Sequence, residues 1–91
     1  MLFPVISTPH PAKPDTIKDV RSQWWPWAED LKSQGKAVCY YVRAGRGAIA
    51  IFDTASNEEL HQFLTQWSNI VPVSFEIYPL VRAEAAQALL K

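Results

Sequence analysis

A few polar residues in the sequence have side chains suited to proton transfer on a carbonyl compound. Glu76 can act as a base, and the hydroxyl groups of Tyr41 and Tyr78 can donate to the oxygen of a developing enolate. Arg43 can bind a carboxylate or polarise a carbonyl group. We predict Glu76, Tyr41 and Tyr78 as catalytic residues and Arg43 as a substrate-binding residue.

These residues can act together only if the fold brings them to one surface. Side chains alternate between the two faces of a strand, and apolar members of each pair should face the core. The residues that this pattern assigns to the core side are Phe3, Val5, Val38, Val42, Ile49, Ile51, Val73, Phe75 and Ile77. The residues assigned to the opposite face, called the open face below, are Leu2, Pro4, Ile6, Cys39, Tyr41, Arg43, Ala48, Ala50, Phe52, Ser74, Glu76 and Tyr78.

The predicted open face combines an apolar wall with a few polar groups, which is typical of a small-molecule pocket. We therefore add Phe52 and Ser74 to Arg43 as substrate-binding residues. His10 lies in a proline-rich loop that could swing over such a pocket, and Trp25 could serve as its lid or as an interface anchor. Each has a structural alternative: an ion pair for Arg43 and Glu76, buried rings for the tyrosines, and a solvent-exposed loop for His10.

The elements that must position these residues follow from periodicity and turn chemistry. Strands are predicted over residues 2–7, 36–43, 48–53 and 71–80, and helices over 15–34, after a Ser56–Glu59 capping box, and over 83–90. Pro26 should kink or divide the first helix, and Pro4 would remove one hydrogen bond from a central strand. The order predicts an α+β domain of the ferredoxin-like βαββαβ type over residues 1–91, with a four-stranded antiparallel sheet, two helices on one face and a short C-terminal helix.

Composition excludes several other functions. Nine basic and nine acidic residues balance, and the basic residues are dispersed, so we expect no nucleic-acid partner. His10 and His61 with scattered carboxylates give no metal-ligand spacing, and no phosphate-binding glycine motif supports a cofactor. The short apolar start cannot span a membrane, and the single Cys39 fits a reducing cytoplasm. Eleven aromatic residues in 91 favour a homo-oligomer.

The chain resembles the muconolactone isomerase family over most of its length, to about Arg82. The residues that carry the resemblance are Met1-Leu2-Phe3 with Val5, Leu31 with Gly35, Ala44-Gly45 leading to Phe52-Asp53, Glu59-Leu60-His61, Pro72, Glu76, and Leu80 with Arg82. The resemblance implies a ferredoxin-like subunit that pairs as a dimeric α/β barrel and assembles into a larger ring such as a decamer. It also implies isomerisation of an unsaturated lactone without a metal or organic cofactor.

The chain departs from the pattern of that family where the family's acid–base residues stand. Pro4 occupies a position where muconolactone isomerases carry histidine, Trp24 and Pro26 replace acidic residues, and Cys39 and Arg46-Gly47 lie where further histidines occur. The resemblance therefore implies a relative with another substrate or with no chemistry.

The residues and the resemblance together leave three alternative functions. The first is a cofactor-independent isomerase or cyclase that transfers a proton on a small unsaturated lactone or carbonyl compound, with Glu76 moving the proton. The second is a non-catalytic oligomeric module that binds a small ligand or only assembles. The third is a cofactor-free oxygenase of the dimeric α/β-barrel type, which rests on analogy of fold.

Overall fold

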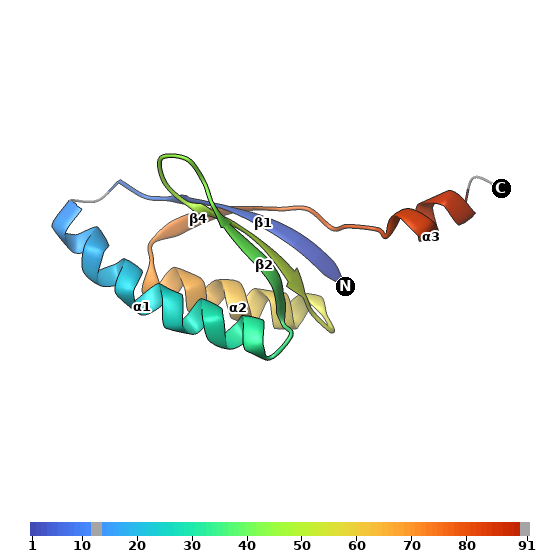
Figure 1. Ribbon diagram of the computed structural model, residues 1–91, viewed down its shortest axis with the longest axis horizontal. Coiled ribbons are helices and arrows are strands. Elements are labelled where there is room, and N and C mark those ends of the chain that lie inside the picture. Colours follow the sequence, from blue (N-terminus) through green and yellow to red (C-terminus); the bar gives the residue numbers. More distant parts are fainter. Residues whose placement is uncertain (12–13, 90–91) are drawn as a thin grey trace.

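The computed structural model describes residues 1–11 and 14–89 and shows a sheet with helices on one side (Figure 1). The elements in chain order are β1 (Leu2–Pro9), α1 (Pro14–Ser33), β2 (Ala37–Val42), β3 (Ala48–Asp53), α2 (Asn57–Ile70), β4 (Val73–Ile77) and α3 (Ala83–Ala88). The four strands form one antiparallel sheet in the order β2-β3-β1-β4. This architecture confirms the predicted ferredoxin-like fold. No helix in the described part of the chain is long and apolar enough to cross a lipid bilayer.

The core lies between the sheet and helices α1 and α2. Phe52 is fully buried at its centre, and Trp24 and Trp67 from the two helices pack with ring centroids 5.2 Å apart. Trp27 on α1 donates from its indole nitrogen to Oε1 of Gln66 on α2 at 2.8 Å. Aromatic packing and this bond hold the two helices against one face of the sheet, so the other face is left uncovered (Figure 1).

Two elements that contain proline, α1 and β1, differ from the sequence prediction. α1 continues as one helix through Pro26, so the predicted division there is wrong. Trp24, Ala28 and Leu31 are buried on both sides of the proline, and this packing compensates for the hydrogen bond that proline removes. β1 extends to Pro9, two residues beyond the predicted end, because Thr8 and Pro9 pair with Ser74 and Val73.

Pro4 lies in a central strand, as the sequence implied, and it limits the pairing of β1 with β4. The backbone nitrogen of Tyr78 donates to the carbonyl oxygen of Pro4 at 3.2 Å. A bonded antiparallel pair normally exchanges two such bonds, and proline has no N–H for the second. β4 accordingly ends at Ile77, earlier than predicted, and only an isolated bridge between Leu2 and Leu80 follows.

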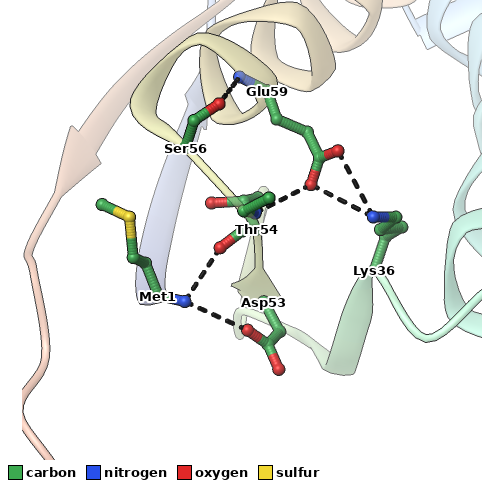
Figure 2. Close-up of polar contacts among 7 residues, drawn as sticks. Met1, Lys36, Asp53, Thr54, Ser56 and Glu59 are labelled. Carbon is green, nitrogen blue, oxygen red and sulfur yellow. Dashed lines mark hydrogen bonds and ion pairs between the residues drawn. The ribbon is translucent and has the colours of Figure 1, made fainter.

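Ser56 caps α2 as predicted, but the return bond of Glu59 comes from Ala55 and not from the N-cap nitrogen of a strict capping box (Figure 2). Oγ of Ser56 accepts from the backbone nitrogen of Glu59 at 3.1 Å, and Oε1 of Glu59 accepts from the backbone nitrogen of Ala55 at 3.1 Å. Lys36 adds an ion pair to Glu59 at 3.3 Å. The hydrogen bond from Ala55, and after it the contact with Lys36, hold the pKa of Glu59 below its usual range. Loss of water around the carboxylate acts in the opposite direction but is outweighed. The loop between β3 and α2 is thereby fixed.

After Tyr78 only the bridge from Leu80 to Leu2 still joins the chain to the sheet. Residues 79–89, called the C-terminal arm below, run away from the sheet and end in α3, which has no buried residue (Figure 1). The radius of gyration is 14.7 Å, whereas a compact chain of this length would have about 12 Å. The arm accounts for the elongated outline of 55 × 25 × 19 Å.

Candidate open-face site

The strand register aligns open-face residues into rows that cross the sheet. Tyr41 on β2 pairs with Ile49 on β3, Ile49 pairs with Ile6 on β1, and Ile6 pairs with Glu76 on β4. In the next row Cys39 pairs with Ile51 and Ile51 pairs with Pro4, which accepts the bond from Tyr78. Half-buried apolar side chains therefore form the centre of the open face, and polar side chains stand at its margins.

Glu76 and Tyr78 form a direct pair at the β4 margin. They lie two residues apart on the same side of the chain, and the Tyr78 hydroxyl donates to Oε2 of Glu76 at 3.0 Å. This hydrogen bond, and secondly the charge of Glu76, raises the pKa of Tyr78. A tyrosine phenol is protonated at neutral pH with or without this shift, so the hydroxyl can donate to the oxygen of a bound carbonyl compound once it turns from Glu76.

His10 and Ser74 form a second pair farther along the same margin. Nε2 of His10 lies 3.0 Å from Oγ of Ser74, and the backbone nitrogen of His10 donates to the carbonyl oxygen of Pro72 at 3.0 Å. Ser74 is also the register partner of Thr8 on β1. The proline-rich loop is thus anchored to the start of β4, and it presents an imidazole two residues along the strand from Glu76.

Arg43 reaches this end of the open face from the β2–β3 turn. Its Nη1 donates to the carbonyl oxygen of Ser7 at 2.9 Å and to Oγ1 of Thr8 at 3.0 Å. The side chain passes Gly47, where an added Cβ would lie 3.4 Å from Cδ of Arg43 and would overlap the Ser7 carbonyl oxygen. Glycine at this position, with φ of +99°, leaves room for the guanidinium group to lie beside Thr8, which pairs with Ser74 on β4.

Ser7 fixes the sheet beneath this cluster. Its buried hydroxyl donates to the carbonyl oxygen of Ala48 at 3.0 Å and accepts from the Ala48 nitrogen at 2.8 Å. These two bonds continue the link between β1 and β3 just beyond their last paired residues, Ile6 and Ile49. Arg46 adds a bond from Nη2 to the carbonyl oxygen of His10 at 3.3 Å. Sequence reasoning missed Ser7 and Thr8, although polar residues after an alternating strand and beside a glycine turn were a usable signal.

The predicted faces of β3 and part of β2 are wrong. Phe52 points into the core and is 0% exposed, so this predicted substrate-binding residue has no access to the open face. Ala48 and Ala50 are buried with it, whereas Ile49 and Ile51 lie on the open face. The prediction placed the larger aliphatic side chains inside, but Trp24 and Trp67 fill the core and leave room only for alanine on β3.

The edge strand and the helix layer place three further residues away from their predicted surroundings; for Trp25 only the pocket lid is affected, and its alternative as an interface anchor stays a prediction. Val38 and Val42 on β2 are exposed rather than packed under the helices, and Val38 lies at an irregularity in the pairing of β2 with β3. Trp25 lies on α1, on the side of the sheet away from the open face, with its ring 4.9 Å from that of Trp24. The structure therefore does not bring Trp25 to the site.

Tyr41 lies on the open face but at the margin opposite Glu76. Three strand spacings of about 4.8 Å separate the two backbones, or roughly 14 Å. The tyrosine side chain is 68% exposed. In a single chain the predicted site residues thus form a group along the β4 margin made of two pairs, Glu76 with Tyr78 and His10 with Ser74. Arg43 lies beside the second pair through its bond to Thr8, the register partner of Ser74, and Tyr41 stands at the opposite margin.

A separate open groove of about 290 Å³ lies between α2 and β4, away from this group. It is lined by His61, Leu64, Thr65, Ser68, Asn69 and Phe75. His61 is the only titratable side chain among these lining residues, so the groove offers no acid–base pair of its own. In the described ranges, 1–11 and 14–89, no cluster of His, Cys, Asp or Glu is arranged to hold a metal ion.

Comparison with solved structures defines the class of the fold. A crystal structure of muconolactone isomerase matches with a TM-score of 0.76 and 28% identity, covering 90% of this chain and 90% of that one. The 5-chloro-2-hydroxyhydroquinone dehydrochlorinase TftG from Burkholderia phenoliruptrix AC1100, in complex with 2,5-dihydroxybenzoquinone, matches with a TM-score of 0.69 and 17% identity, covering 93% and 98%. Both similar structures are enzymes with this α+β fold.

The family is shown by the sequence itself. Residues 1–91 match the model of the domain of unknown function DUF3303, and the chain belongs to that family. No curated protein matches the chain.

Proposed function

We propose that the chain is a cofactor-independent isomerase or cyclase that transfers a proton on a small unsaturated lactone or carbonyl compound. The observation that carries the proposal is the Glu76–Tyr78 pair, which places a carboxylate and a phenol donor 3.0 Å apart beside an apolar floor. Likeness of fold to an isomerase and a dehydrochlorinase supports the same class of function.

In the proposed reaction Glu76 is both the base and the acid. Its carboxylate removes a proton from the carbon next to the substrate carbonyl, and the electron pair of the broken C–H bond forms an enolate or dienolate. The Tyr78 hydroxyl turns from Glu76 to the enolate oxygen and stabilises its charge. Glu76 then returns the proton to a different carbon, so the double bond moves without oxidation or reduction.

The other members of the group would hold the substrate. The guanidinium group of Arg43 can bind a carbonyl or carboxylate oxygen, since its recorded hydrogen bonds to described residues use only Nη1. Ser74 and His10 supply a hydroxyl and an imidazole at the same end. Ile6 and Pro4 provide the floor on which an unsaturated ring can lie.

The site is exposed in a single chain, and we propose that a second copy covers it. Pairing of two open faces would bury their apolar centres and exclude water from Glu76, which strengthens polar interactions with a substrate. Such dimers could assemble into a larger ring. The protein would work in the reducing cytoplasm, where Cys39 on the open face stays a thiol.

A non-catalytic ligand-binding or assembly module is the second candidate. Arg43 and Arg46 both bond to the backbone of β1 or the loop after it, which is a structural use of their charge. A module of this kind would bind an apolar ligand on the open face without changing it.

Deuterium exchange tests the proposed chemistry before the natural substrate is known. Small unsaturated γ-lactones are incubated with the protein in D₂O, and proton NMR follows loss of the signal next to the carbonyl. The wild type should accelerate exchange, and Glu76→Gln should lose roughly 100-fold or more of that acceleration. Glu58→Gln, on α2 at the far side of the sheet, is the matched control and should exchange like the wild type.

Equal exchange by Glu76→Gln and the wild type would remove Glu76 from the chemistry. Binding of the lactones without exchange in any variant would favour the ligand-binding module. Near-ultraviolet circular dichroism from the tryptophan cluster shows in each case that the variant is folded.

A further inference from the structure

A serine and a histidine that are distant in the sequence meet on the open face. Nε2 of His10 lies 3.0 Å from Oγ of Ser74, although 64 positions separate the two residues along the chain. A hydroxyl group and an imidazole at hydrogen-bond distance are the two partners that nucleophilic catalysis requires. The imidazole takes the proton, and the hydroxyl oxygen attacks a carbonyl carbon.

The backbone of the sheet sets the geometry of this pair. Ser74 is the register partner of Thr8, and the backbone nitrogen of His10 donates to the carbonyl oxygen of Pro72 at 3.0 Å. His10 is thus opposite Pro72 and diagonal to Ser74, on the same face of the sheet, because residues two apart on a strand share a face. A diagonal neighbour is within reach of a long side chain such as histidine. Strand pairing therefore brings the imidazole to the hydroxyl group.

The side-chain pair is not needed to anchor the loop that contains His10. The backbone of His10 is already held on both sides, by its bond to Pro72 and by the bond from Nη2 of Arg46 to its carbonyl oxygen at 3.3 Å. His10 and Ser74 are both exposed, so water competes for their hydrogen bond and the bond adds little to stability. The same exposure leaves both groups accessible to a substrate.

A cation lies beside the serine. Nη1 of Arg43 donates to Oγ1 of Thr8 at 3.0 Å, and Thr8 is the direct partner of Ser74 across the strands. The Cβ atoms of such partners are about 4.5–5.5 Å apart, so the guanidinium group is a close neighbour of the serine. Among the described residues the side-chain hydrogen bonds of Arg43 involve Nη1 only. Nη2 can therefore donate to a carbonyl oxygen that gains negative charge as Ser74 attacks.

We propose that Ser74 and His10 form a catalytic dyad that hydrolyses small carboxylic esters and lactones. In the tautomer protonated at Nδ1, Nε2 of His10 accepts the hydroxyl proton while Oγ of Ser74 bonds to the carbonyl carbon, and the π electron pair moves to the oxygen beside Arg43. The tetrahedral intermediate then re-forms the carbonyl group and breaks the C–O bond to the alcohol, whose oxygen takes the proton from His10. In a lactone this alcohol stays attached to the acyl group, so the ring opens.

Water completes the reaction. A water molecule attacks the acyl-serine ester while His10 takes one of its protons, and collapse of the second intermediate returns that proton to Oγ of Ser74. The products are a carboxylic acid and an alcohol, and nothing is oxidised or reduced. Glu76 and Tyr78 take no part in these steps, so the dyad does not rest on the isomerase proposed above.

A fluorophosphonate probe tests the dyad before a natural substrate is known. Such a probe phosphonylates a serine that a neighbouring base activates. We expect the label on Ser74, located by tandem mass spectrometry, and none at this position in Ser74→Ala. His10→Gln keeps a hydrogen-bonding side chain but removes the base, so it should be labelled roughly 100-fold more slowly. Ser33→Ala on α1 and His61→Gln on α2 are the matched controls and should be labelled like the wild type.

Hydrolysis of para-nitrophenyl acetate, corrected for the rate in buffer, gives a second measurement. Ser74→Ala, His10→Gln and the double variant should each lose the same factor, because a nucleophile and its base act as a unit. Losses that multiply in the double variant overturn the dyad, and so does labelling of Ser74 that is independent of His10. Hydrolysis that survives in Ser74→Ala but not in His10→Gln also overturns it, because the imidazole would then attack the ester itself. Near-ultraviolet circular dichroism confirms that each variant is folded.

The lactone incubation described above separates the two activities, since the dyad yields a ring-opened acid and the isomerase exchanges deuterium. If Ser74 is not labelled and no acid forms while exchange depends on Glu76, the isomerase stands and the dyad is lost. If Ser74 is labelled with the help of His10 and exchange is insensitive to Glu76, the hydrolase stands without the isomerase.

Discussion

The hydroxyl group of Tyr78 lies 3.0 Å from Oε2 of Glu76, two residues earlier on the same face of β4. The hydrogen bond and the negative charge both favour the neutral phenol, so they raise its pKa. Because this pair needs only one strand in an extended conformation, it forms in the single chain before any assembly. It is therefore a property of the local sequence Glu76-Ile77-Tyr78.

Replacing Glu76 should make Tyr78 easier to ionise. Glu76→Gln removes the charge, and the pKa of Tyr78 should fall toward its ordinary value. The measurement is a pH titration of tyrosinate absorbance, with Tyr78→Phe used to subtract the signals of Tyr40 and Tyr41. Burial and the charge of Glu29 raise the pKa of Tyr40, so Tyr40 should ionise after Tyr78 in both proteins. An unchanged titration of Tyr78 would show that the pair is absent in solution.

Ser7→Ala should lower the free energy of unfolding by about 1–3 kcal/mol, because it leaves two polar groups of Ala48 without their buried partner. Chemical denaturation followed by tryptophan fluorescence measures the change. Ser33→Ala on α1 is the matched control, since that exposed hydroxyl bonds only to the Asp30 carbonyl oxygen within its own helix. Equal loss in both variants would contradict the role given to Ser7.

Gly47→Ala should destabilise the protein more than Gly45→Ala does. Both glycines have a left-handed φ, +99° and +97°, so alanine at either costs about 1–2 kcal/mol for the backbone conformation alone. A Cβ at Gly45 meets no other atom, whereas a Cβ at Gly47 overlaps the Ser7 carbonyl oxygen. Comparing the two unfolding free energies isolates this overlap. Equal values would mean that the turn does not pack against β1 as described.

The Glu59 contacts should stabilise the protein at neutral pH and not in acid. The pKa of Glu59 is lowered in the folded state, so its contribution is present above the unfolded value of 4.5 and is lost as the pH falls through the folded value. Glu59→Gln should therefore be less stable than the wild type at neutral pH, and the difference should shrink below that folded value. Denaturation at a series of pH values measures it.

Glu58→Gln provides the control for that experiment. Glu58 also lies in the first turn of α2, so it shares the favourable interaction with the helix dipole but not the bonds from Ala55 and Lys36. A pH dependence for Glu58→Gln as large as that for Glu59→Gln would assign the effect to the dipole.

The order of elements and the open-face residues of β1 and β4 were predictable from the sequence. Phe75 between Ser74 and Glu76 has a clear alternation, and Ser56 with Glu59 has the spacing of a capping box. Both signals depend on neighbours a few residues away. Hydrophobic periodicity and local hydrogen bonds therefore sufficed for these elements.

The face of β3 could not be predicted in the same way, because both of its sides are apolar. Choosing between Ile51 and Phe52 requires the volume that Trp24 and Trp67 occupy, and those residues come from two helices distant in the sequence. The contacts of Arg43 with Ser7 and Thr8 depend in turn on the absence of a side chain at Gly47. Such three-body arrangements leave no pattern in a single sequence.

Pro4 decides where β4 stops being part of its own sheet. Without a proline N–H to donate to Tyr78, this pair keeps one of its two hydrogen bonds, and the chain separates after a single further bridge at Leu80. A residue in the first strand thus sets the point at which residues 81–89, the last nine described, separate from the sheet. The strand β4, which positions Glu76, and the segment after it are one continuous stretch of backbone. Pro4, near the other end of the chain, sets where that stretch stops pairing with the sheet. A residue with an N–H at position 4 would extend the ladder and tie the arm more closely to its own body.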